Sequence, residues 1–88
     1  MRKRQEKSEV HNRVSVLRVA QGLSRQDLAS AVGVTFQTIG YLERGEYSPS
    51  IELALRLATF FKLPVEQIFS LTPFPPLSET LRAAQKGE

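Results

Sequence analysis

The chain has 88 residues, which is enough for one small domain and too few for two. It has no cysteine and a single histidine, His11, so disulfide frameworks, cysteine zinc sites and histidine metal cages are excluded. Arg56 and Lys62 interrupt the longest apolar stretch, residues 53–63, and no secretory signal is visible, so we expect a cytoplasmic protein that does not span a membrane. No phosphate-binding loop, nucleophile–base pair or cofactor motif is visible, and we expect neither an enzyme nor a bound cofactor or metal.

The positive charge is concentrated at the N-terminus. The formal net charge is +3, with five basic and two acidic residues in residues 1–13 and seven of each from residue 14 onward. A basic segment can contact phosphate groups, whereas the alternative for residues 1–8 is a solvated, disordered terminus. We assign residues 1–9 to a basic flexible arm.

Five short helices and no strand are predicted in the body of the chain. The first spans residues 11–21, where apolar residues recur at helical spacing. Ser24, followed by Asp27 three residues later, forms a capping-box pattern at the start of the second helix, and Gly33 ends that helix. Thr35 caps a third helix over residues 36–43.

The remaining elements follow a turn-rich loop. Ser50 caps a fourth helix over residues 51–61, which is apolar on several sides and is therefore expected at the centre of the domain. A last short helix carries Val65, Ile68 and Phe69. Residues 10–69 are the predicted domain, and the proline-rich segment that begins residues 70–88 predicts an extended tail.

The most informative segment is residues 25–44, RQDLASAVGVTFQTIGYLER, in which a tight turn joins two short helices. Ala29 is small where the helices cross, and Gly33 can adopt a positive φ. Ile39 and Leu42 point towards the core. The outward positions, left for solvent or a ligand, are Phe36, Gln37, Gly40, Tyr41 and Arg44.

Residues 13–69 resemble the lambda-repressor-like, or XRE-type, helix-turn-helix family. The matching segments are LRVAQGLSRQDLASAVGV, TFQTIGYLERGEYSPSIELALRLATFF and LPVEQIF, in the order and spacing of the family. The resemblance implies an all-α fold, a compact five-helix DNA-binding domain. It also implies a sequence-specific transcriptional regulator, a repressor, that binds a palindromic operator through the major groove as a homodimer.

By the same resemblance, the third helix is the recognition helix. Gln37 can form two hydrogen bonds with adenine, and Phe36 can touch a thymine methyl group, although Phe36 could instead be a core residue. Tyr47 contacts phosphate or, alternatively, packs against its own loop. The expected base contacts are Thr35, Phe36, Gln37, Gly40 and Tyr41, and the expected phosphate contacts are Arg25, Thr38, Arg44, Tyr47, Ser48 and Ser50 with the start of the fourth helix.

Two positions depart from the family pattern. Gly40 stands where a side chain often reads a base, so either the backbone approaches DNA closely there or readout at that position is lost. Arg25 stands where glutamine commonly holds a phosphate and supports the recognition helix. Arginine can hold phosphate more strongly, and its support of the helix stays an open question.

The family also implies an ion pair and a dimer. Arg18 and Glu43 match an ion pair that links the first helix to the end of the third, and the alternative is a loose surface pair. The segment after Ile68 is expected to add to a homodimer interface, with a disordered tail as the alternative. The apolar residues available for that interface are Phe69, Leu71, Phe74 and Leu77.

A second hypothesis is a protein-interaction module that keeps the fold without the DNA function. The electrically neutral body and Gly40 favour it. An antitoxin, which binds a toxin as well as its own operator, would combine both functions. In that case the tail is the expected binding segment for the partner.

Overall fold

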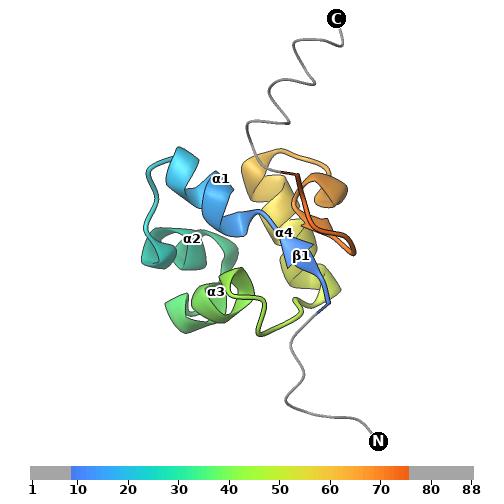
Figure 1. Cartoon of the computed structure of the whole chain (residues 1–88). Helices are drawn as coiled ribbons and strands as arrows, with labels where there is room; N and C mark the ends of the chain where they lie inside the picture. The colour runs from blue at the N-terminus through green and yellow to red at the C-terminus, as the bar shows by residue number, and fades with distance from the viewer. Residues whose placement is uncertain (1–8, 76–88) are drawn as a thin grey trace, which may run out of the picture.

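The computed structural model describes residues 9–75, in which four short α-helices pack together and a two-stranded sheet joins the two ends (Figure 1). Residues 1–8 and 76–88 lie outside the described residues, and with them most of the predicted arm and Leu77. In chain order the elements are β1 (His11–Asn12), α1 (Val14–Ala20), α2 (Arg25–Val32), α3 (Phe36–Glu43), α4 (Ile51–Phe61), a 3-10 turn (Val65–Gln67) and β2 (Phe69–Ser70).

Side-chain caps start α2, α3 and α4 at the predicted residues. Ser24 Oγ accepts a hydrogen bond from the Asp27 N–H at 2.9 Å, and an Asp27 carboxylate oxygen accepts one from the Ser24 N–H at 3.0 Å. Hydrogen bonding to the Asp27 carboxylate from the backbone and the side chain of Ser24 holds the pKa of this carboxyl below its usual value. Thr35 and Ser50 each accept from the backbone N–H three residues later, at 3.3 and 3.0 Å. Each cap satisfies an amide that a helix start would leave unpaired.

A left-handed glycine ends α2 and begins the tight turn to α3. Gly33 has φ +83°, a conformation that penalises any side chain. A Cβ at this position would also lie 2.8 Å from Nη1 of Arg56, which donates a hydrogen bond to the Val32 carbonyl at 3.2 Å. The turn therefore needs glycine both for its backbone and for the space that Arg56 occupies.

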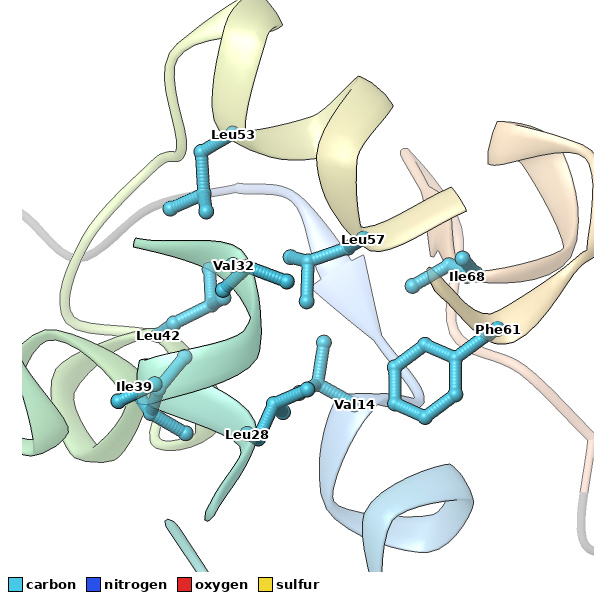
Figure 2. Close-up of a cluster of buried hydrophobic side chains, with 10 residues drawn as sticks. Val14, Leu28, Val32, Ile39, Leu42, Leu53, Leu57, Phe61 and Ile68 are labelled. Atoms are coloured by element: carbon cyan, nitrogen blue, oxygen red, sulfur yellow. The ribbon is translucent and has the colours of Figure 1, made fainter. Parts of the chain in front are cut away.

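The core lies between α4 and the first three helices. Figure 2 shows Leu53, Leu57 and Phe61 of α4 pointing towards side chains from α1, α2 and α3. Burial of a large apolar side chain contributes about 1.5–3 kcal/mol, so this cluster supplies most of the free energy that offsets the conformational entropy lost on folding. The buried residues are Val14, Leu28, Ala29, Val32, Ile39, Leu42, Leu53, Leu57, Phe61 and Ile68.

The small helical domain is confirmed, but the expectation that its body has no strand is wrong at the N-terminal end. The first helix does not begin near His11 but at Val14, because His11–Asn12 forms β1 and pairs antiparallel with β2. His11 lies opposite Ser70 in this pairing. The partner strand is about 60 residues away along the chain, so no local pattern in the sequence could reveal it.

The predicted fifth helix is also wrong. Residues 65–67 form one 3-10 turn, and Phe69 already belongs to β2, so a helix cannot continue. β2 spans Phe69–Ser70, on both sides of the boundary predicted between residues 69 and 70. Beyond it, the ring of Phe74 lies 4.2 Å from Cζ of Arg13, which keeps the chain against the body of the domain.

No helix within residues 9–75 is long and apolar enough to cross a bilayer. The same residues contain no group of three or more histidine, aspartate or glutamate side chains that could hold a metal ion.

Candidate nucleic-acid interface

Helix α3 is buried on one face and open on the other. Ile39 and Leu42 point into the core with at most 1% of their surface exposed. On the opposite face Phe36 and Tyr41 are each about half exposed, at 48% and 49%, and Gln37 is exposed. Phe36 is therefore not a core residue, and α3 presents polar and aromatic groups on a rigidly anchored element.

A shallow depression of about 140 Å³ lies on this outward face. It joins residues of α3 to the first residue of α2 and to the residue that follows α3. Its lining consists of Arg25, Phe36, Gln37, Gly40, Tyr41 and Arg44, all of them predicted DNA contacts.

The other predicted contacts lie at the two ends of α3. Thr35 caps the helix, and its hydroxyl lies 3.1 Å from that of Thr38. At the far end, Tyr47 and Ser48 are exposed on the loop to α4, and Ser50 is exposed at the start of α4. Tyr47 retains 38% exposure, which leaves its ring accessible from solvent.

A buried carboxylate fixes the end of α3 to both preceding helices. Arg18 of α1 donates to the two oxygens of Glu43, from Nε at 2.7 Å and from Nη2 at 3.3 Å. Arg25 of α2 donates from Nε to Oε1 at 3.0 Å. The side chain of Glu43 is 3% exposed and that of Arg18 is 13% exposed, so this is not a loose surface pair.

The contribution of Arg25 to this cluster is absent from the sequence predictions. Arg25 and Glu43 are 18 residues apart on different helices, so no helical spacing links them. The contact answers the open question about Arg25, because its guanidinium supports α3 through Glu43. With 44% of its side chain exposed, Arg25 also remains accessible from the depression.

Gly40 is not exposed, contrary to the expectation. It is buried, and a Cβ built on it would lie 3.2 Å from Nη1 of Arg44. The Arg44 guanidinium also lies over the ring of Tyr41, with Cζ 5.3 Å from the ring centroid, and its Nε is 3.3 Å from a carboxylate oxygen of Glu46. A side chain from one helical turn later therefore covers this position.

A further positioning residue, Asn12, is also absent from the sequence predictions. Its Nδ2 donates to the carbonyl of Leu42 at 2.9 Å, and its Oδ1 accepts from the N–H of Val14 at 3.0 Å. The first bond satisfies a carbonyl in the last turn of α3, and the second satisfies the first backbone amide of α1. Strand β1 therefore ties α1 to α3.

The predicted dimer residues do not form one exposed surface in the structure. Phe69 is partly buried against the core, and Phe74 packs on Arg13. Leu71, in contrast, is 78% exposed. Leu77 lies outside the described residues.

Comparison with known proteins places this arrangement in a family. Residues 16–68 match the helix-turn-helix family. An HTH-type transcriptional regulator of Methanocaldococcus jannaschii is 41% identical over 58 residues, which cover 66% of this chain and 88% of that protein. The cryptic phage CTXphi transcriptional repressor RstR of Vibrio cholerae is 30% identical over 59 residues, which cover 67% of this chain and 53% of that protein.

A solved structure supports the same assignment. The restriction-modification controller protein C.AhdI from Aeromonas hydrophila shares 34% identity with this chain at a TM-score of 0.59. The similarity covers 62% of this chain and 83% of that one. The chain therefore belongs to the XRE-type, lambda-repressor-like helix-turn-helix family.

Proposed function

We propose that this protein is a sequence-specific transcriptional regulator that binds double-stranded DNA by placing α3 in the major groove. The observation that carries the proposal is the outward face of α3, where Gln37, Arg25 and Arg44 line one depression while the opposite face is buried in the core. A helix of this kind, with free side chains on a fixed backbone, is the element that helix-turn-helix proteins insert into the groove.

The base contacts in this proposal come from the first turns of α3. Gln37 pairs with adenine through its amide, an interaction that discriminates between bases by about 1–3 kcal/mol. Phe36 contacts a thymine methyl group, and Tyr41 offers its hydroxyl. Thr35 stands at the entry to the helix. Gly40 drops out of this set because the Arg44 side chain covers it.

Phosphate contacts are proposed on both sides of α3. On one side, Arg25 contacts phosphate with the guanidinium nitrogens that are not bonded to Glu43. Thr38 makes its contact from the first turn of α3. On the other side are Tyr47, Ser48 and Ser50 with the first amides of α4. Such contacts position the protein on DNA without reading its sequence.

We further propose that the protein acts in the cytoplasm as a homodimer and represses transcription by occupying a palindromic operator. One α3 covers a half-site, and a two-fold pair of recognition helices about 34–36 Å apart would cover two. Of the predicted dimer residues that the structure describes, Leu71 is the one that exposes most of its side chain and could contribute apolar surface to the dimer. The related RstR protein is named a repressor.

Selection from a random duplex library tests the proposal. The full-length protein is expected to enrich a palindrome with half-sites about one helical turn apart, and its affinity should fall linearly on a log–log plot against salt. Gln37→Ala should relax the preference at one position of each half-site. Tyr47→Phe, which removes one hydroxyl, should weaken binding to all enriched sequences alike.

Failure to enrich any sequence, or affinity that does not change with salt, would overturn the proposal. It would instead favour a protein-interaction module, such as an antitoxin that binds a toxin. Within residues 9–75, six basic side chains face six acidic ones, so the described domain supplies no net positive charge of its own. For this reason, base-specific contacts on α3 are central to the DNA hypothesis.

A further inference from the structure

An arginine occupies the place of the side chain that position 40 lacks. Three atoms of the Arg44 guanidinium lie within 4 Å of the Cβ position of Gly40: Nη1 at 3.2 Å, and Cζ and Nη2 at 3.9 Å each. Residues four apart lie on the same face of a helix, so Arg44 can fold back one turn along the outward face of α3. The absence of a side chain at Gly40 makes room for it.

Two neighbours hold the guanidinium in this position. The ring of Tyr41 lies under it, with 5.3 Å between Cζ and the ring centroid, and a carboxylate oxygen of Glu46 forms an ion pair with Nε at 3.3 Å. Arg44 and Glu46 are 47% and 40% exposed, and exposed ion pairs are weak and easily exchanged for another partner. The guanidinium is therefore oriented before any ligand arrives and remains free to change partners.

We propose that Arg44 reads a guanine in the major groove, in place of the side chain missing at Gly40. This inference rests on the proposed DNA-binding function and replaces the expected phosphate role of Arg44. The planar fork of arginine donates two hydrogen bonds to O6 and N7 of guanine, which is the commonest specific contact between proteins and DNA.

The position of the guanidinium favours a base over a phosphate. It lines the same depression as Gln37 and Tyr41 and lies against the Cβ position of Gly40. Of the proposed phosphate contacts only Arg25 also lines this depression. The others lie in the first turn of α3, on the loop to α4 and at the start of α4.

The same placement predicts where the guanine lies in the operator. Position 40 is three residues beyond Gln37, or about 4.5 Å along the helix axis. This distance is close to one base-pair step of about 3.4 Å. The guanine is therefore expected within one or two base pairs of the adenine that Gln37 reads.

Selections with the wild type and three variants test the inference. Arg44→Ala removes the guanidinium. Gly40→Ala leaves Arg44 intact, but its Cβ would lie 3.2 Å from Nη1, so the guanidinium must move by a few tenths of an ångström. In Arg44→Ala the preference for guanine at one half-site position should fall about 5- to 140-fold, the range of one bidentate pair, while other positions keep theirs. In Gly40→Ala the same preference should fall by less. Arg25→Ala, the matched change at the other arginine of the depression, should weaken all sequences alike.

A thermal melt separates readout from folding. Alanine forms helix better than glycine, so Gly40→Ala should melt at the same temperature as the wild type or higher while its base preference relaxes. A wild-type consensus without such a guanine, or a guanine preference that survives in Arg44→Ala, would overturn the inference and leave the DNA-binding proposal intact. A wild type that enriches no sequence would overturn both.

Discussion

The Glu43 carboxylate connects three helices, and replacing it with an amide tests how firmly α3 is fixed. Glu43→Gln removes the charge that faces Arg18 and Arg25 while keeping the size of the side chain. Removing one partner of a buried ion pair costs about 3–5 kcal/mol, because the remaining charge stays in a poorly solvated site. Arg18 is 13% exposed and keeps its bond to the Leu23 carbonyl, so we expect the lower end, about 3 kcal/mol.

Urea unfolding followed by far-UV circular dichroism at pH 7 measures this loss. Glu46→Gln is the matched control, since the same chemical change there affects a pair in which both side chains are 40–47% exposed, and it should cost less than about 1 kcal/mol. Equal losses in the two variants would refute the argument that burial makes the Glu43 cluster important. A loss of about 3 kcal/mol would lower the melting temperature by roughly 12–24 °C in a domain of this size.

Three further predictions follow from local geometry. Gly22→Ala should lower the free energy of unfolding by about 1–2 kcal/mol, because its φ is positive and no atom lies within 4 Å of the new Cβ. Gly33→Ala should lower it further, because its Cβ also displaces the Arg56 guanidinium. Chemical denaturation compares the two variants, and equal losses would argue against the steric contribution of Arg56. Because the pKa of Asp27 is lowered in the folded protein, its carboxylate stabilises the fold at neutral pH, and this stabilisation is lost as the pH falls below about 4. The melting temperature of Asp27→Asn should therefore depend less on pH in that range than the melting temperature of the wild type. Leu71→Asp should shift the mass measured by light scattering from dimer to monomer, and an unchanged mass would exclude Leu71 from the interface.

The helices with local start signals are predicted well by the sequence. Ser24, Thr35 and Ser50 cap α2, α3 and α4, and each signal depends on residues at most three positions apart. Gly33 marks the turn for a similarly local reason, a backbone conformation that favours glycine. The two faces of α3 follow from helical periodicity in the same way.

The misses involve contacts between residues distant in the sequence. The first helix is predicted too early because Asn12 pairs with Phe69, and the last helix is predicted where a strand is needed to complete that pairing. The link from Arg25 to Glu43 crosses between helices. Gly40 is placed on an exposed face because spacing shows where a backbone position points but not which neighbouring side chain will cover it.

The pairing of β1 with β2 has a consequence for synthesis on the ribosome. Asn12, which bonds the first amide of α1 and the Leu42 carbonyl of α3, is itself held in place by a strand that is translated almost 60 residues later. Until residues 69–70 leave the exit tunnel, the nascent chain can form its capped helices but cannot secure β1. Maturation of the α3 surface is therefore expected to be a late event that follows completion of this strand pair.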